Sequence, residues 1–364
     1  MAAGFVALML AIAASAPATA QALFSDVSDA RAADVSPSQS AAIQRIISSA
    51  ATRSLSIVRV DGALLRGATA NQSIEINIDS AVTLNATSKE SRSLTEGRFV
   101  WKGEISGDAL PNGSATIVMN GDNATGTIQT PDGRLYRLQP IGDGRNALIE
   151  VDRSKVPPDH EPGAPPMPRQ KSQIETAPGG RAAEVAPETP PVIDLVVAYT
   201  TNAMNAHGDI LSLIDLAIAE TNESFANSGI SASVRLVHTA EYSYSEAGKS
   251  FATMVGDFGG RDDGQMDSIH ALRDQHGGDV AVLLIDNNAA CGRAYDIGAD
   301  AETAFVVVHW ENCATGYYSF GHEIGHLAGA RHDVARDDST IMAALKRASA
   351  NVTETQGKPA EEPH

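Results

Sequence analysis

Residues 322 to 332 read HEIGHLAGARH, and the spacing of their three histidines constrains the fold of this chain more than any other feature. Positions i and i+4 of an α-helix lie on one face, so His322 and His326 can direct both imidazoles at a single point. Gly329 can adopt a positive φ at little steric cost, so we expect the helix to end there and the chain to turn back with His332. The pattern predicts a metal site made of three imidazoles.

The residues of this motif also indicate catalysis. Three protein ligands leave a fourth tetrahedral position for water, as in catalytic zinc sites, whereas structural sites are usually closed by four Cys or His. Glu323 follows the first ligand and is rotated by about 100° around the helix axis, which places its carboxylate beside that water. Such a water has a pKa of about 7, and Glu323 can take its proton and return it to a leaving amine. We predict a zinc cofactor, Glu323 as general base and peptide-bond hydrolysis.

The composition limits the class of protein and its partners. With 364 residues, of which 43% are hydrophobic and 20% charged, the chain is long enough for two domains. Its 27 basic and 45 acidic residues give a net charge of −18, which opposes binding to nucleic acid or to an anionic membrane. We expect a monomer without nucleic-acid partners or stable membrane association that acts on protein or peptide substrates.

The start of the chain is typical of a secretory signal. An apolar run from Phe5 to Ala14 is followed by small residues at Ala18, Ala20 and Ala22 that fit an A-x-A cleavage site. Residues 1–22 are therefore predicted to be a signal peptide of a secreted or periplasmic protein, with a short buried or membrane helix as the alternative. The two cysteines, Cys291 and Cys313, would pair with each other in an oxidising compartment; the alternative is two buried thiols.

Residues 23–156 are predicted to form an antiparallel β-rich domain. Short β-prone runs such as SIVRV, RFVWKGEI and LYRLQPI alternate there with turn signals such as NG and DG. Residues 157–191 are rich in Pro, Gly, Ala and Glu, which predicts an exposed linker open to proteolysis. This order is typical of a zymogen whose propeptide ends at about residue 190. The alternative is a permanent accessory domain.

Residues 192–350 are predicted to form the catalytic domain, and residues 351–364 a polar tail. Apolar runs indicate strands at VIDLVVAY, ISASVRLVH, VAVLLI, GRAYDI and AFVVVHW, with helices over 209–226, over about 263–276 and from about 319. Strands and helices that alternate in this way build a mostly parallel five-stranded sheet covered by helices, an α/β or α+β fold.

From Val192 to Met342 the chain resembles the reprolysin-like branch of the metzincin zinc metalloproteases, and most closely the bacterial secreted peptidyl-Asp metalloendopeptidases. The resemblance rests on VIDLVVAYT, NSGI, MDSIHALRDQHG, CGRAY and SFGHEIGHLAGARHD. It implies a metzincin-like catalytic domain, a propeptide that binds the enzyme, and cleavage on the amino side of Asp.

The resemblance also implies roles for residues outside the motif. Asp333 would fix the base of the site, and Met342 would form the methionine turn beneath the zinc. The alternatives are a turn-capping Asp333 and an ordinary core Met342. By position, an edge strand that pairs with an extended substrate would consist of Gly292, Arg293, Ala294 and Tyr295.

Two features of the sequence leave alternatives for the activity and for the latency of the protein. Met342 follows His332 more closely than in reprolysin-like enzymes, and the segment after it is short and polar. A catalytically impaired homologue that binds zinc or peptide without turnover is therefore an alternative, and a zinc amidase acting on cell-wall peptides is another. The pro-region has no cysteine to block the zinc, so an acidic side chain or His160 could occupy the open position.

Overall fold

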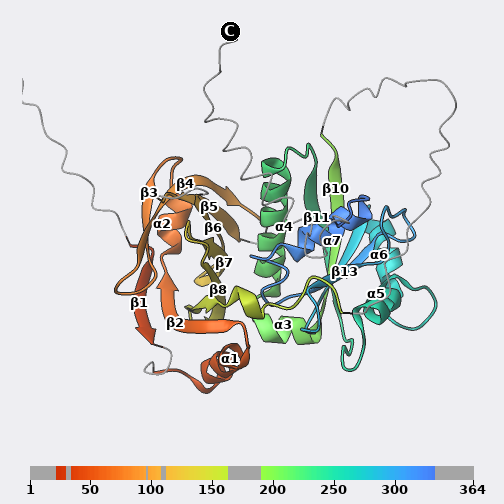
Figure 1. Ribbon diagram of the computed structural model, residues 1–364, viewed down its shortest axis with the longest axis horizontal. Helices are drawn as coiled ribbons and strands as arrows, with labels where there is room; N and C mark the ends of the chain where they lie inside the picture. The colour runs from red at the N-terminus through yellow and green to blue at the C-terminus, as the bar shows by residue number, and fades with distance from the viewer. Residues whose placement is uncertain (1–21, 30–33, 96, 108–111, 163–189, 333–364) are drawn as a thin grey trace, which may run out of the picture.

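The computed structural model describes residues 22–29, 34–95, 97–107, 112–162 and 190–332. In this part of the chain two β-sheets lie side by side, and helix α4 (Ile210–Asn227) stands between them (Figure 1). The parts outside the described residues include almost all of the predicted signal peptide, most of the predicted linker, Asp333, Met342 and the polar tail.

The first sheet has nine strands in the described residues, and every neighbouring pair is antiparallel, which confirms the predicted β-rich N-terminal region. Its strands, in spatial order, are β1 (Phe24–Asp29), β2 (Thr52–Val60), β9 (Arg145–Val151), β8 (Leu135–Gly142), β7 (Asn123–Gln129), β6 (Gly113–Asn120), β5 (Phe99–Ile105), β4 (Thr83–Ser93) and β3 (Ser73–Asn77). The Leu23 N–H donates to the Glu75 carbonyl at 2.7 Å. This bond brings the two edges of the sheet together, and the sheet curls around a buried apolar core.

Three short helical segments complete this unit. They are α1 (Pro37–Ser48), α2 (Gly62–Gly67) and the 3-10 turn η1 (Arg153–Lys155). Helix α1 begins with a capping box, in which the Ser36 side chain accepts from the Gln39 N–H and the Gln39 side chain accepts from the Ser36 N–H. The turn η1 leads from the last strand of this sheet toward the second one.

The second sheet follows the order β11, β10, β12, β14, β13. Its strands are β10 (Val192–Thr200), β11 (Ser233–Tyr242), β12 (Val280–Ile285), β13 (Gly292–Ala294) and β14 (Phe305–His309). All neighbouring pairs are parallel except β13 with β14. Every residue of β12 and β14 is buried, as expected for central parallel strands that are covered on both faces.

Helices cover both faces of the second sheet. Apolar residues of α3 (Thr201–His207), α4 and α7 (Ser319–Leu327) share one core cluster with it. Residues of α5 (Phe251–Gly259) and α6 (Ser268–His276) form the cluster on the other face. The sequence did not predict α3 and α5, and α6 begins five residues later than the predicted helix over 263–276.

Helix α7 carries the H-E-x-x-H sequence and ends where the glycine of the motif allows it. Ala328 caps the helix, and Gly329 follows with a φ of +94°, a conformation that a residue with a Cβ rarely adopts. The Gly329 N–H donates to the His326 carbonyl at 2.8 Å. The chain therefore turns back at the end of α7 instead of continuing along the helix axis.

The first sheet packs on α4 through a buried ion pair and an apolar cluster. Arg98 Nε donates to Asp215 Oδ2 at 2.6 Å, and neither side chain is more than 8% exposed. Loss of either partner would leave a buried charge uncompensated, at a cost of about 3 to 5 kcal/mol. The apolar cluster beside this pair is made of Val100, Val118, Leu216 and Ala219. Helix α4 also covers the second sheet and so joins the two sheets. The Arg137–Glu311 ion pair and the hydrogen bonds from Gln139 to the Ala206 and His207 carbonyls join them as well.

A second buried carboxylate lies in the same interface. Glu220 is 3% exposed and accepts hydrogen bonds from the Thr127 hydroxyl in β7 and from the Gly316 N–H at 2.8 Å, just before α7. Burial raises the pKa of Glu220 to about 7, although these two hydrogen bonds oppose the rise. The first sheet, α4 and the approach to α7 therefore meet at one titratable group.

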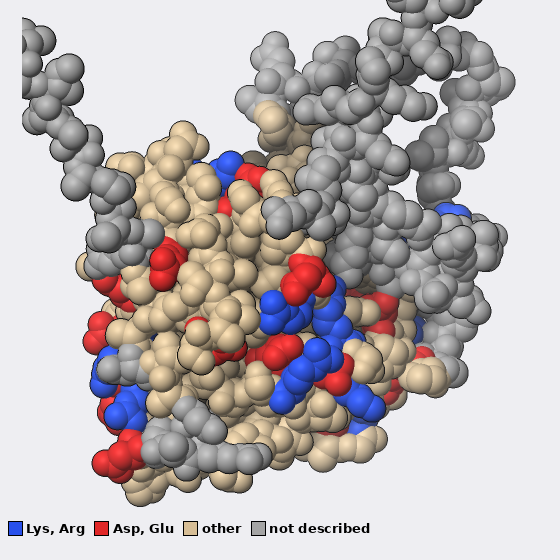
Figure 2. All heavy atoms as spheres, turned by 60° about the vertical axis from the view of Figure 1, so that its left-hand side comes forward, with Lys and Arg blue, Asp and Glu red and all other residues tan. Residues whose placement is uncertain are grey.

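The surface of the first sheet carries both signs of charge. Figure 2 shows Lys and Arg interspersed with Asp and Glu on this face, with broad areas of neither kind between them. Among the helices in the described residues, none is long and apolar enough to cross a membrane.

We predict that Glu220→Gln reduces the pH dependence of stability. The raised pKa keeps Glu220 protonated in the folded protein up to about pH 7, whereas the carboxyl of the unfolded chain ionises near 4.5. The stability associated with this group is therefore fully present below about pH 4.5 and is lost as the pH rises to about 7. The expected loss is on the order of 2 to 3 kcal/mol. Urea unfolding of the full-length chain between about pH 5 and pH 8 measures it.

Glu302→Gln is the control, because Glu302 lies outside this interface with its side chain 68% exposed. That substitution should leave the pH dependence of unfolding close to that of the unmodified chain. Identical pH profiles for Glu220→Gln and the unmodified chain would contradict the role assigned to the buried carboxyl.

Candidate metal centre

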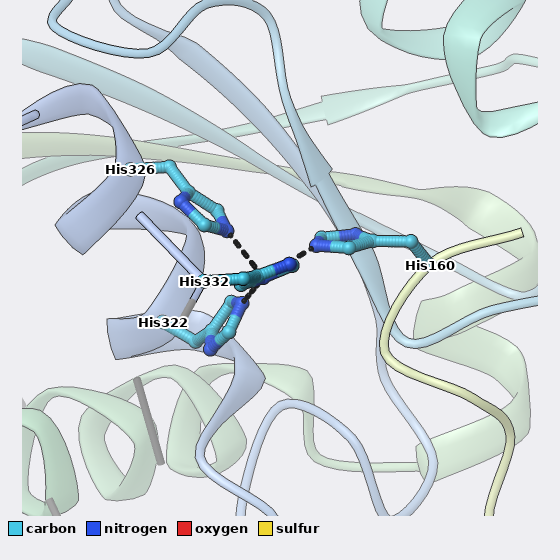
Figure 3. A group of neighbouring side chains, drawn as sticks. All are labelled: His160, His322, His326 and His332. Atoms are coloured by element: carbon cyan, nitrogen blue, oxygen red, sulfur yellow. Dashed lines mark hydrogen bonds between the residues drawn. The ribbon is translucent and has the colours of Figure 1, made fainter. Parts of the chain in front are cut away.

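Four imidazoles converge beside α7 (Figure 3). His322 and His326 lie on the helix, His332 returns after the turn at Gly329, and His160 approaches from the opposite side on the segment after η1. His332 Nε2 lies 3.2 Å from His322 Nε2, 3.1 Å from His326 Nε2 and 3.1 Å from His160 Nε2. One ligand atom from each of the four rings lies within 4.8 Å of all the others. The structure thus brings the three histidines of the motif together and adds a fourth.

Main-chain carbonyls orient two of the four rings. His326 Nδ1 lies 2.9 Å from the Ala330 carbonyl, and His160 Nδ1 lies 3.0 Å from the Gly292 carbonyl. A carbonyl can only accept, so each of these Nδ1 atoms is the protonated nitrogen. In the neutral tautomer the lone pair is then on Nε2, which faces the cluster, and this is the usual arrangement of a histidine that binds a metal.

Burial keeps the cluster uncharged. Loss of solvation lowers the pKa of His160 and of His326 to about 4, lowers the pKa of His322 well below its ordinary value, and lowers the pKa of His332. All four imidazoles are therefore neutral at neutral pH. Only the neutral ring can offer a lone pair to a metal ion.

The four nitrogens fit a divalent cation that prefers imidazole. A tetrahedral zinc ion with bonds of about 2.0 to 2.1 Å separates its nitrogen ligands by about 3.3 Å. The three separations measured from His332 Nε2, at 3.1 to 3.2 Å, are close to this value. His322 Nδ1 is buried and has no hydrogen-bond partner among the described residues. The donor set therefore suits zinc and other imidazole-binding transition metals.

Glu323 lies beside the cluster in a fully buried position. Its side chain is 0% exposed, and neither carboxylate oxygen has a hydrogen-bond partner within the described ranges. Burial raises the pKa of Glu323 well above its ordinary value, and the nearby Ala294 N–H and the Arg293 charge only partly oppose this. Its Oε1 lies 3.8 Å from His160 Nδ1. A raised pKa makes the Glu323 carboxylate a stronger base than an ordinary carboxylate, because its ionised form takes up a proton more readily.

Gly292 lies directly against Glu323, and this close contact, which could not be predicted from the sequence, explains why position 292 is a glycine. A Cβ at this position would lie 2.7 Å from both Cγ and Oε1 of Glu323. Contacts that short do not occur, so any side chain would displace the carboxylate or the strand. The sequence offered no signal for this close approach, because it is made between positions far apart in the chain.

The predicted substrate-binding strand is β13, which lies at the edge of the second sheet. Gly292, Arg293 and Ala294 pair with β14. Tyr295 lies beyond the strand, but its N–H still donates to the Phe305 carbonyl at 2.9 Å, so the predicted run Gly292–Tyr295 is one residue longer than β13. Burial lowers the pKa of the Arg293 guanidinium, which lies 7% exposed near the site.

The predicted disulfide is confirmed. Cys291, immediately before β13, is bonded to Cys313, with 5.1 Å between the two Cα atoms. The Cys313 carbonyl accepts from the Ser319 N–H at 2.9 Å, at the first residue of α7. The bridge therefore joins the edge strand to the loop that leads into the histidine helix.

The beginning of the predicted linker differs from the expectation of an exposed segment. Residues 157–162 lie against β13, where the Cys291 N–H donates to the Pro158 carbonyl at 2.8 Å and the Gly292 N–H donates to the Asp159 carbonyl at 3.0 Å. The reason is that an edge strand presents unpaired main-chain groups, and any extended backbone can pair with them whatever its side chains. Residues 163–189 lie outside the described residues.

Comparison with known proteins agrees with this geometry. Residues 189–358 match the family model Reprolysin_5, metallo-peptidase family M12. The chain is 38% identical over 346 residues to the peptidyl-Asp metalloendopeptidase of Stenotrophomonas maltophilia (strain K279a), covering 92% of this chain and 80% of that protein. It is 37% identical over 323 residues to the enzyme of the same name from Xanthomonas campestris pv. campestris, covering 85% and 75%.

A cluster of neutral imidazoles beside a buried carboxyl, on a chain with these relatives, defines a metallopeptidase. The chain belongs to the reprolysin-like metallopeptidases of family M12, together with the peptidyl-Asp metalloendopeptidases. The resemblance and the enzyme class predicted from the sequence are thereby confirmed. The metal's identity and the roles of Glu323, Asp333 and Met342 stay predictions.

We predict that Gly292→Ala lowers peptide hydrolysis by about 10- to 100-fold. The reason is that the new Cβ displaces the Glu323 carboxylate from its position beside the cluster of imidazoles. Gly256→Ala in α5 is the matched control, since a Cβ there meets nothing within 4 Å. Cleavage of casein by the two variants, with thermal unfolding to check the fold, measures the effect. Equal activity of both variants would show that the glycine has no catalytic importance.

Proposed function

We propose that this chain is the zymogen of a secreted zinc endopeptidase in which His322, His326 and His332 hold the metal and Glu323 is the general base. The observation that carries this proposal is the convergence of three motif imidazoles beside a buried carboxyl. Zinc is proposed among the possible metals because three imidazoles with one position left for water form a common catalytic zinc site.

The proposed chemistry divides between the metal and the protein. When bound, zinc polarises the carbonyl of a peptide bond and makes a water molecule acidic. Glu323 takes the proton from that water as it attacks the carbonyl carbon. Burial keeps the pKa of Glu323 well above its ordinary value, so the protonated carboxyl is long-lived enough to pass the proton to the leaving amine nitrogen.

The peptide substrate would lie along β13. An extended chain can add to the free edge of a sheet through main-chain hydrogen bonds, and the N–H groups of Cys291 and Gly292 already donate to backbone carbonyls there. Gly292, Arg293, Ala294 and Tyr295 are the residues proposed for this role. Asp333 and Met342, which lie outside the described residues, are proposed to support the base of the site, with Gly329 ending the helix.

The domain organisation is part of the same proposal. Residues 1–22 would be the signal peptide, 23–156 the propeptide domain, 157–191 the linker, 192–350 the catalytic domain and 351–364 the tail. The packing of the first sheet on α4 and of residues 157–162 on β13 supports a propeptide that binds its own enzyme. The apolar N-terminal segment and the disulfide support export.

A preference for bonds on the amino side of Asp is proposed from the relatives. Proteins 37% to 38% identical to this chain over most of its length are named peptidyl-Asp metalloendopeptidases. The preference concerns the residue that follows the cleaved bond, so a pocket specific for a carboxylate would have to lie beside the metal.

We expect Glu323→Gln to lower peptide hydrolysis by at least about 10²-fold, because the amide cannot accept the proton from the attacking water. The variant should retain one equivalent of zinc by elemental analysis, since the three imidazoles are unchanged. Glu302→Gln, in an exposed ion pair with Arg261, serves as control and should stay active. Full activity of Glu323→Gln would remove Glu323 from the mechanism.

The metal content from elemental analysis and the measured peptidase activity together separate the proposal from its alternatives. Protein without any divalent metal in its folded, processed form would overturn the metal site itself. One equivalent of zinc in unmodified protein that cleaves no protein or peptide would instead favour a homologue that binds without turnover.

The side-chain preference is tested by mass spectrometry of the peptides released from a denatured protein mixture. We expect peptides whose first residue is Asp to dominate in the digest by unmodified protein and to be absent from the digest by Glu323→Gln. New N-termini distributed according to the composition of the mixture would contradict the preference while leaving the endopeptidase intact.

A further inference from the structure

We propose that His160 is the fourth protein ligand of the metal in the uncleaved chain, and that it closes the position at which hydrolysis would begin. The inference rests on the proposed function, because it assigns a ligand to the same metal. It identifies the group that makes the zymogen latent, which the sequence left open between an acidic side chain and His160.

The geometry of His160 is that of a ligand. Its Nε2 lies 3.1 Å from His332 Nε2, about the same distance that separates His332 Nε2 from the Nε2 atoms of His322 and His326. Its ring is stacked on the His332 ring, with the two centroids 4.8 Å apart. The Gly292 carbonyl accepts from its Nδ1 at 3.0 Å, which leaves the Nε2 lone pair directed into the cluster (Figure 3).

The residues on either side of His160 are fixed to the catalytic unit, by main-chain carbonyls before it and by a side chain after it. The Pro158 and Asp159 carbonyls accept from consecutive N–H groups at the start of β13. On the other side, Glu161 Oε2 accepts from the Phe251 N–H at 2.9 Å, at the first residue of α5. Residues 157–161 therefore occupy the same edge that an extended substrate would need, with the imidazole held between two anchored neighbours.

The acidic alternatives are less suited to this role. The Glu161 carboxylate is committed to the N-terminus of α5, and Asp159 is not among the residues whose ligand atoms converge in the cluster. The sequence before residue 191 contains no cysteine and no histidine other than His160. His160 is thus the one imidazole that this part of the chain can offer, and it has no thiolate.

Four imidazole ligands would leave a bound zinc ion no position for water. Glu323 would then have no acidic proton to accept, and His160 would keep a substrate carbonyl away from the metal. The block consists of noncovalent contacts of residues 157–161, which precede the region 163–189. A cut in that region alone therefore leaves His160 in place, and activation requires residues 157–161 to leave β13.

Cobalt substitution tests the proposal without relying on activity. The full-length chain carrying Glu323→Gln, which prevents self-cleavage, is loaded with Co²⁺ and compared with the same chain carrying His160→Ala. The readouts are the visible absorption of the bound Co²⁺, which responds to the number and type of its ligands, and the affinity for acetohydroxamate, a small chelating probe. Elemental analysis gives the metal content of each sample.

We expect both chains to bind one equivalent of Co²⁺ and to differ in spectrum, because a water replaces one imidazole in His160→Ala. Acetohydroxamate should bind the His160→Ala chain at least about tenfold more tightly, since it no longer competes with a tethered ligand. His276→Ala, which changes a partly buried histidine stacked on His238, should behave like the parent chain, as should Asp159→Asn and Glu161→Gln.

The outcomes separate this inference from the proposed function. Equal spectra and equal probe affinities in the parent and His160→Ala chains, with metal bound in both, would overturn the fourth ligand and leave the peptidase proposal standing. A spectral change in Asp159→Asn or Glu161→Gln with none in His160→Ala would assign the block to a carboxylate and overturn the inference. Absence of metal from every sample would overturn the proposed function as well.

A variant that fails to fold does not remove the test. His160→Gln retains a polar side chain of similar size and should give the same changes as His160→Ala. The parent chain also provides a readout of its own. Its Co²⁺ spectrum should stay insensitive to acetohydroxamate after a cut within 163–189 and become sensitive once residues 157–161 are separated from the catalytic unit. Sensitivity in the intact parent chain would contradict the proposal.

Discussion

The site depends on one constraint, which is that neutral imidazole nitrogens are brought together in a largely buried place. Two of them come from successive turns of α7, and the positive φ of Gly329 returns the chain so that His332 joins them. Main-chain carbonyls fix the tautomer of His326 and of His160. Uncharged rings whose lone pairs face each other gain nothing from one another in the absence of a cation. The packing of the two sheets and their helices must therefore hold the imidazoles in place.

The first sheet contributes to the site although it carries no catalytic group of its own. It packs on α4, the helix that also covers the second sheet, through Arg98 and Asp215. Glu220 connects β7 with Gly316, three residues before Ser319, where α7 begins. The same unit ends in the segment that lies along β13. The first sheet thus contacts the approach to the histidine helix, and the segment that follows it lies along the edge strand β13.

Much of the site could be predicted from the sequence because its chemistry is local. The motif places His322, Glu323 and His326 on one helix, and the structure has that helix over Ser319–Leu327. The buried strands β12 and β14 were found because their apolar runs are continuous. Strand β4 was missed because its buried positions are Ala86 and Ser88, which give no apolar alternation. Helix α3 has only seven residues, and α5 contains two glycines, which weaken the helical pattern. The contact of Gly292 with Glu323 joins distant parts of the chain and gave no local signal. His160 could be named from the sequence only as one of two kinds of candidate for the open position, because its distance to the other imidazoles is set by the fold.

The bridge between Cys291 and Cys313 has a consequence for where the enzyme can work. It is the one covalent bond between the start of β13 and the loop that precedes Ser319, the first residue of α7. In a reducing cytosol both sulfurs would remain thiols, and the distance between that strand and the imidazoles would be governed by weak forces alone. The bridge would therefore hold the catalytic geometry only where the surroundings are oxidising.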